Sequence, residues 1–112
     1  MNIKSIFDKL RNYREDDNDI KIDELNEIMK TNPNSVLLDV RSPQEYSEEH
    51  LNGAINIPLY ELEICCDCKL NDKDKIIIVY CQSGTRSKKA IKILKKSGFK
   101  NLYHLENGLD GI

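Results

Sequence analysis

Short apolar runs alternate along the chain with amphipathic stretches, and the clearest example spans residues 76–98. Ile76 to Tyr80 form a β-branched apolar run, which predicts a buried strand. A polar loop that contains Gly84 follows this run. From Ser87 onward, apolar residues recur at helical spacing between lysines. We therefore expect a strand, a tight loop and a helix that ends at a glycine C-cap, Ser97-Gly98.

The same alternation of strands and helices is expected from Ile20 to the end of the chain. Asp23 is a candidate N-cap, and residues 42–45 form a capping box with proline at the first helical position. Strands that alternate with helices imply a parallel sheet covered on both faces, with right-handed crossovers. The predicted fold is a small doubly wound α/β sheet of about five mainly parallel strands. The expected strands are residues 20–22, 35–40, 53–57, 76–80 and 101–105, and a further helix is expected from Leu59 to about Cys68.

Cys81 lies where the buried strand at residues 76–80 ends and the loop begins. Ligands bind at this edge of open α/β sheets. Backbone N–H groups of the loop and of the first helical turn, the helix dipole and Arg86 all favour an anion there. The thiolate of Cys81 should be stabilised, and the same donors should hold an anionic substrate. Buried cysteines are commonly inert, but Gly84, Arg86 and the helix start together favour a nucleophile.

Several segments carry recognisable patterns in a fixed order. Cys81-Gln82-Ser83-Gly84-Thr85-Arg86 has the form Cys-x-x-Gly-x-Arg. Upstream, Leu38-Asp39-Val40-Arg41 is followed by Glu45-Tyr46, and residues 46–57 form a second segment with Asn52 where proline is usual. Near the end, residues 107–112 follow a Gly-Gly-hydrophobic-x-x-Trp pattern, with Asn107 and Ile112 as departures. Together these segments resemble the signatures of single-domain rhodaneses, the sulfurtransferases, over about residues 20–112.

The resemblance implies two-step sulfur transfer without a cofactor or a metal ion. Cys81 would take the outer sulfur of a small anionic donor such as thiosulfate and become a persulfide. Cyanide, another thiol or a protein acceptor would then remove that sulfur. Arg86 would orient the anionic group of the donor. Asp39 and Arg41 would support the site, more as ties between loops than as substrate contacts. The substrate and the persulfide would be held by Gln82, Ser83, Gly84, Thr85 and Arg86.

Two other functions stay open at this point. A phosphatase or arsenate reductase can share this fold and this cysteine. The related phosphatases have one more residue between cysteine and arginine, whereas only residues 82–85 intervene here, which favours sulfur over phosphate. The second alternative is a sulfur-carrier or regulatory module without strong turnover, because a fold does not by itself decide a function.

Composition and charge narrow the remaining classes. The chain has 112 residues, 32% of them charged, and a net charge of −2, as expected of one small domain with an ordinary polar surface. It has neither a strongly basic balance nor an aromatic-basic stripe for nucleic acid, and no long apolar stretch for a membrane span. No signal-peptide pattern is present, so we expect a cytoplasmic protein whose four cysteines stay reduced.

The first nineteen residues differ in pattern from the rest. Residues 1–13 have apolar positions at helical spacing, and the polar, acidic stretch 14–19 is typical of a linker. We therefore divide the chain into an N-terminal helix and linker, residues 1–19, and a rhodanese-like domain, residues 20–112. Docking of the helix on its own domain is favoured over binding to a partner or a membrane surface.

The histidines and the other cysteines are assigned structural roles. Rhodaneses activate their cysteine with loop amides and not with a histidine base, so His50 and His104 are interpreted as structural. Cys65, Cys66 and Cys68 lie on the helix that begins at Leu59, and packing or surface thiols are the favoured interpretation. A redox partner for Cys81 is less favoured, and so is a metal site. A structural zinc ion normally takes four ligands, and no second pair lies at zinc spacing.

Overall fold

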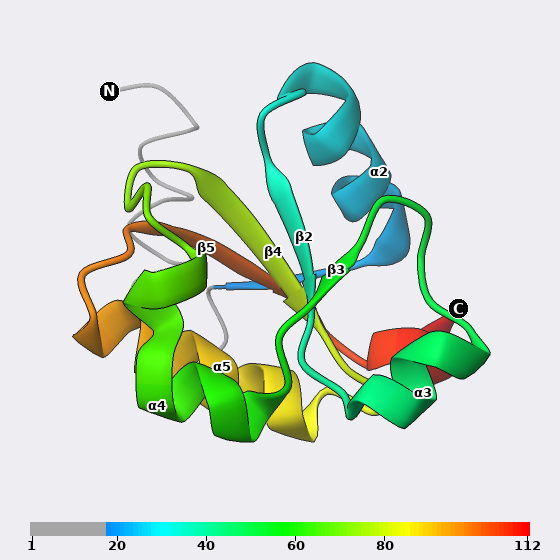
Figure 1. The fold of residues 1–112 in the computed structure, drawn as a ribbon. Coiled ribbons are helices and arrows are strands. Elements are labelled where there is room, and N and C mark those ends of the chain that lie inside the picture. Colours follow the sequence, from blue (N-terminus) through cyan, green and yellow to red (C-terminus); the bar gives the residue numbers. More distant parts are fainter. Residues whose placement is uncertain (1–17) are drawn as a thin grey trace, which may run out of the picture.

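The structure is a computed structural model that describes residues 18–112 (Figure 1). Five strands form one sheet in the order β1-β5-β4-β2-β3. All four strand pairings are parallel, so the predicted parallel α/β fold is confirmed. The amphipathic helix expected in residues 1–13 lies outside the described residues. The elements are β1 (Asp19–Ile20), α2 (Ile22–Thr31), β2 (Val36–Asp39), α3 (Pro43–Glu48), β3 (Ile55–Asn56), α4 (Leu59–Lys69), β4 (Ile76–Tyr80), α5 (Thr85–Lys96), β5 (Asn101–Leu105) and the 3₁₀ helix η1 (Gly108–Gly111).

The sheet is covered on both faces, as Figure 1 shows for α4 and α5 on one side and α2 on the other. Successive strand residues point to opposite faces, so neighbours in one strand enter different cores. Leu38 packs in the core that contains Leu62 and Leu94 from α4 and α5. Its neighbour Leu37 packs in the core that contains Leu25 from α2. This double burial explains why the strands are apolar runs with no polar alternation.

Strand β4 is the centre of the molecule and carries the chain to the functional loop. It pairs with β2 on one side and with β5 on the other. Residues 77–81 are all buried, and Tyr80 and Cys81 are fully so. A central strand with two neighbours is rigid, because both rows of its backbone hydrogen bonds are used. Cys81 is therefore held at a fixed point on the carboxyl edge of the sheet.

Two predicted boundaries near the start of the domain were wrong. The first strand is residues 19–20 and not 20–22, and α2 begins at Ile22. The N-cap is Lys21 and not Asp23, which lies in the first turn. The backbone N–H of Lys21 donates to the Glu24 carboxylate at 3.2 Å, so this glutamate captures the helix start two residues earlier than expected.

The helix boundaries further along follow the predictions more closely. Ser42 and Glu45 form the expected capping box, in which the Glu45 N–H donates to Ser42 Oγ at 3.2 Å. Helix α5 begins at Thr85, two residues before the predicted start. Gly84 is its N-cap, with φ at +103°, a conformation that glycine adopts without steric cost. The early start brings the helix N-terminus closer in sequence to Cys81.

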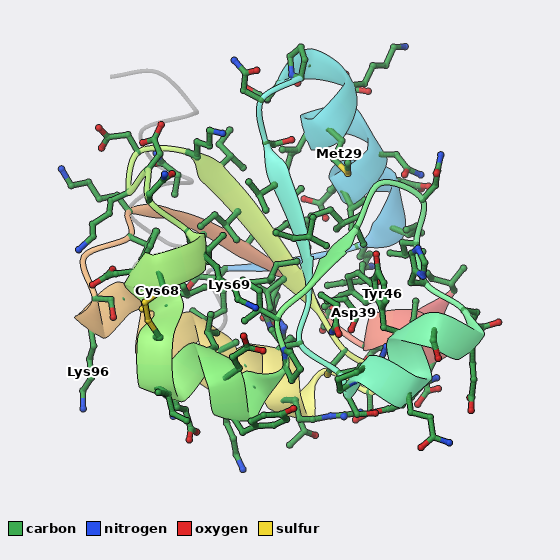
Figure 2. All side chains as sticks on the ribbon, viewed as in Figure 1. Met29, Asp39, Tyr46, Cys68, Lys69 and Lys96 are labelled. Atoms are coloured by element: carbon green, nitrogen blue, oxygen red, sulfur yellow. A yellow bond between two sulfur atoms is a disulfide. The ribbon has the colours of Figure 1, made fainter. Side chains whose placement is uncertain are left out.

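The expectation that all four cysteines are free thiols was wrong. Cys65 and Cys68 form a disulfide, visible on α4 in Figure 2, while Cys66 and Cys81 are free. Cys65 leaves the helical conformation (φ −153°, ψ 62°), and its Cα lies 5.4 Å from that of Cys68, a separation that a disulfide spans. The three cysteines of this helix therefore do not form a shared set of thiol ligands.

Candidate active site

The loop from Cys81 to Arg86 turns around the sulfur atom of Cys81. The backbone N–H of Gly84 donates to Cys81 Sγ at 3.0 Å, and that of Ser87 does so at 3.4 Å. The Ser87 hydroxyl also lies 3.6 Å from Sγ. All three groups belong to the N-cap and the first turn of α5, where helix N–H groups have no intrahelical acceptor. Because the positive end of the helix dipole adds to these donors, the site favours a negatively charged sulfur.

The 3₁₀ helix η1 packs against the loop of residues 81–86. The backbone N–H of Leu109 donates to the Cys81 carbonyl at 3.1 Å, and that of Asp110 donates to the Gln82 carbonyl at 2.9 Å. The Gln82 side chain also donates to the Asp110 carboxylate at 2.7 Å. Gly108 has φ at +59°, and a Cβ there would lie 2.3 Å from the Cys81 carbonyl oxygen. Element η1 can pack this closely against the loop because Gly108 has no side chain.

Arg86 binds a carboxylate of the protein. Its Nη1 and Nη2 donate to the two oxygens of Glu45 at 2.6 and 3.0 Å. This bidentate pair, together with the capping-box contacts of Glu45, lowers the pKa of that carboxyl to about 2. The Glu45 carboxylate likewise raises the pKa of Arg86. Arg86 thus joins α5 to α3 beside the loop, with 36% of its side chain still exposed.

Asp39 and Arg41 are buried together at the ends of β2 and the loop after it. Arg41 Nη2 donates to Asp39 Oδ2 at 2.9 Å and to the Glu49 carbonyl at 2.6 Å. Its Nη1 lies 3.4 Å from Gln82 Oε1, in the Cys81 loop. Burial disfavours the Arg41 cation, but the hydrogen bond and charge of Asp39 still raise its pKa above the ordinary value. These contacts tie three loops together near Cys81.

The two histidines have different surroundings. His50 is exposed, its Nδ1 lies 2.8 Å from the Tyr46 carbonyl, and its ring stacks on that of Tyr46. His104 is buried, and its Nδ1 lies 3.0 Å from Ser87 Oγ. Its Nε2 contacts the carboxylate of Asp19. Neither Ser87 nor Asp19 was predicted from the sequence as a functional residue, and His104 was predicted to be only structural.

An open pocket adjoins the loop. Its volume is about 460 Å³, and Ser83, Gly84 and Thr85 form part of its wall. The side of α5 that faces it carries lysines, while His104 and two carboxylates complete the lining. The charged lining residues are Lys88, Lys89, Lys92, Asp19 and Glu106. A small anion could therefore approach the loop past a mixed but mainly positive surface.

Known proteins with the same elements identify the family. A family model described as "Rhodanese-like domain" matches residues 21–112. The chain belongs to the rhodanese-like domain family. This match covers the whole described sheet except β1, and it confirms the resemblance to rhodaneses that the sequence motifs indicate.

Individual relatives agree with the family. The chain is 37% identical to a structure titled "rhodanese with anions from E. coli", with a TM-score of 0.62, over 70% of this chain and 91% of that one. It is similar to the solution structure of a rhodanese-like domain from Anabaena (25% identity, TM-score 0.75, 84% of this chain and 71% of that one). It is also 36% identical to the tRNA uridine(34) hydroxylase of Hamiltonella defensa over 80% of this chain. The chain spans only 26% of that hydroxylase.

Two kinds of feature are absent from the part of the chain that the structure describes. None of its helices over residues 18–112 is long and apolar enough to cross a membrane. Over the same residues, no three His, Cys, Asp or Glu side chains converge as a set of metal ligands.

Proposed function

We propose that this rhodanese-like domain is a sulfurtransferase that moves a sulfane sulfur through a persulfide on Cys81. The observation that supports this most is the pair of backbone N–H groups, from Gly84 and Ser87, that point at Cys81 Sγ. Such donors stabilise the thiolate, the persulfide anion and the negative charge on sulfur in the transition state that connects them. The proposed chemistry uses a nucleophile and hydrogen-bond donors that both belong to the chain.

The proposed reaction has two displacement steps. The Cys81 thiolate attacks the outer sulfur of a donor such as thiosulfate, a new S–S bond forms, and sulfite leaves with the electron pair of the old bond. An acceptor such as cyanide or a thiolate then attacks the terminal sulfur of the persulfide. Its bond to sulfur forms, the S–S bond breaks, and the Cys81 thiolate is regenerated. The positive α5 lysines beside the pocket support an anionic donor.

The relatives named as tRNA uridine(34) hydroxylases raise the question whether this chain also acts on tRNA. The similarity to the Hamiltonella defensa hydroxylase spans 26% of its length, so its activity as a whole protein is not carried over to this chain. The donors around Cys81 support sulfur transfer, and the proposal does not extend to hydroxylation of a tRNA. The acceptor is proposed to be a small nucleophile or a protein thiol. The cytoplasmic location expected from the sequence stays a prediction.

Mass spectrometry and a turnover assay test the proposal together. Protein loaded with thiosulfate should gain one sulfur atom on Cys81, and a reductant should remove it. Cys81→Ser should lower thiocyanate production by more than about 1000-fold, because a hydroxyl cannot form the persulfide. Cys66→Ser, which changes the other free thiol of the described region, is the matched control and should keep activity. Residual activity of the Cys81 variant within about tenfold of the parent would exclude Cys81 as the nucleophile.

The same measurements separate an enzyme from a sulfur carrier. A carrier would gain one sulfur per chain and hold it, with little thiocyanate formed when cyanide is added. An enzyme would release it in repeated cycles. The donors that would hold a persulfide lie around Cys81 Sγ, and an open pocket adjoins the loop, so turnover is the expected result.

A further inference from the structure

A continuous chain of polar groups leads from Asp19 to the sulfur of Cys81. The Asp19 carboxylate contacts His104 Nε2, and His104 Nδ1 lies 3.0 Å from Ser87 Oγ. Ser87 Oγ in turn lies 3.6 Å from Cys81 Sγ. His104 and Ser87 are 4% and 0% exposed, so water does not replace these contacts. Four side chains from four parts of the fold therefore form one connected path.

The sheet fixes the far end of this path. Asp19 of β1 is the register partner of His104 of β5, so both side chains emerge on the same face of the sheet. The His104 N–H donates to the Asn18 carbonyl at 2.9 Å, which holds the two strands together at this point. That face is the one covered by α5, and Ser87 lies in the first turn of that helix. The alignment follows from the backbone, so the path is pre-organised.

The neighbours of His104 determine where its protons lie. A carboxylate only accepts, so Asp19 requires a proton on Nε2. Nδ1 of the neutral ring is then an acceptor, and the Ser87 hydroxyl donates to it. The hydroxyl has only one proton, and this hydrogen bond to His104 uses it. The Gly84 carbonyl, 3.1 Å from Ser87 Oγ, is an alternative acceptor for the same proton. Ser87 Oγ keeps free lone pairs, which can accept the proton of the Cys81 thiol.

We propose that Ser87 and His104 carry the thiol proton of Cys81 away and that Asp19 stabilises the imidazolium that results. The thiol proton moves to Ser87 Oγ as the Ser87 proton moves to His104 Nδ1, so no proton is created or lost. The product is a thiolate that accepts from Gly84 N–H, Ser87 N–H and the Ser87 hydroxyl, opposite an imidazolium paired with a carboxylate. Ser87 touches the reacting sulfur, whereas His104 and Asp19 act through it and are positioning residues.

This proposal rests on the proposed sulfur transfer, for which it supplies the activation of the nucleophile. Charged groups of both signs line the pocket beside His104. Asp19 approaches from β1, Glu106 from the end of β5, and three lysines line the same pocket from α5. The two displacement steps together begin and end with the Cys81 thiolate, so the proton can stay on His104, between Ser87 and Asp19, throughout the cycle.

Histidine ring NMR tests the coupling without any sulfur donor. The chain has two histidines, so His50, stacked on Tyr46, is an internal control. We expect the ring nitrogens of His104 to report the Nε2–H tautomer and to show a second inflection as the Cys81 thiol ionises. Cys81→Ser, which preserves size but removes the ionisation, should abolish that inflection and leave the His50 curve unchanged. Identical His104 curves in the two proteins would overturn the proposal.

Kinetics test the role in the reaction. His104→Asn keeps an amide near Ser87 but cannot take up a proton. Loading of sulfur from thiosulfate should slow about 100-fold at neutral pH, with the KM for thiosulfate little changed. The loss should shrink at high pH, where hydroxide removes the thiol proton directly, and Asp19→Asn should show a smaller loss of the same form. His50→Asn, the matched control, should load at the parental rate.

The two possible failures are distinguishable. A loss in His104→Asn that is equal at every pH would show a merely structural role and overturn the relay. If the parent protein loads no sulfur at all, the proposed function fails. The NMR experiment still decides whether the Cys81 proton is shared with His104, because it does not use a donor.

Discussion

Arg86 is paired with Glu45, and this pair changes what its substitution should do. The Arg86 guanidinium already donates two hydrogen bonds to the Glu45 carboxylate. To bind an anionic donor, it must release Glu45 or bind the donor through its remaining N–H groups. We predict that Arg86→Ala slows loading from thiosulfate by about 10- to 100-fold, as expected for loss of a charge-assisted contact of about 1.5–3 kcal/mol. Glu45→Gln should leave loading unchanged or raise it, because it frees the guanidinium.

Stopped-flow or quenched loading assays on the two variants separate the possible roles. If Arg86 only clamps α5 to α3, both substitutions break the same clamp and should slow loading equally. Equal losses would therefore contradict a donor-binding role. Opposite effects would support the exchange of Glu45 for the donor.

The same pair predicts a pH dependence of stability. The pKa of Glu45 is about 2 in the folded protein, below its ordinary value of 4.5. A depressed carboxyl pKa stabilises the folded state above the unfolded value, and this stabilisation is lost as the pH falls through the folded value. The difference in unfolding free energy between the parent and Glu45→Gln should be constant above about pH 5, fall steeply toward pH 2 and vanish by about pH 1. Its plateau should be about 0.5–1 kcal/mol, since the pair is partly exposed.

Urea unfolding at a series of pH values measures this difference. Glu48→Gln, on the same helix, is the matched control for a change of charge. A difference that persists unchanged at pH 2 would mean that Glu45 acts through packing and not through its ionised pair with Arg86.

Single residues also show where sequence reasoning succeeds and where it ends. Cys81 could be predicted because its environment comes from its sequence neighbours: a buried strand before it, then Gly84 and the helix start. The partners of His104 are 17 and 85 positions away in the chain. Their meeting depends on the register of β1 against β5, which no local pattern specifies. The only feature in the sequence that could have indicated a role for His104 was its position inside a strand predicted from apolar neighbours.

At the scale of elements, the closing helix η1 and the active loop form one unit. Gly108→Ala should place a Cβ 2.3 Å from the Cys81 carbonyl oxygen and 2.5 Å from that of Gln82. Neither backbone group can move without displacing the anion site. We predict a loss of about 2–3 kcal/mol in unfolding free energy and a clear fall in turnover, because overpacking is added to left-handed strain.

Gly53→Ala is the matched control for the strain alone. Gly53 also has a positive φ, +86°, but a Cβ there meets nothing within 4 Å. The Gly53→Ala variant should lose only about 1–2 kcal/mol of unfolding free energy and keep the turnover per folded molecule of the parent. Urea unfolding and thiocyanate assays on both variants give the comparison. Equal stability losses with unchanged turnover in both would show that η1 does not support the site.

Element boundaries were predicted well where a side chain marks them and less well elsewhere. The Ser42–Glu45 box placed α3 correctly, since both of its hydrogen bonds form. The start of α2 was missed because Glu24, and not Asp23, accepts the free N–H group. Asn107 stands where the family pattern has glycine, and its φ of −109° needs none. That departure leaves the closing turn intact.

At the scale of the whole molecule, the cysteines lie at two ends of α5. Cys81 contacts the N-terminal end, through Gly84, and Cys66 Sγ donates to Ser97 Oγ at 3.0 Å at the C-terminal end. In Figure 2, Cys68 likewise lies beside the end of α5 that carries Lys96. A 12-residue helix is about 18 Å long, whereas a disulfide needs Cα atoms within about 7 Å. The hypothesis of a redox partner for Cys81 on α4 therefore conflicts with the structure.

This separation leads to a prediction about the disulfide. Cys65→Ala with Cys68→Ala should keep turnover within about threefold of the parent, because changes at distant sites act independently. The variant should lose up to about 2 kcal/mol of unfolding free energy, the chain-entropy value for so short a loop. Thiocyanate assays and urea unfolding measure both effects. The double variant is preferable to a reductant, which would also remove the persulfide from Cys81. A collapse of turnover in a folded double variant would show that the far end of α5 communicates with the active loop.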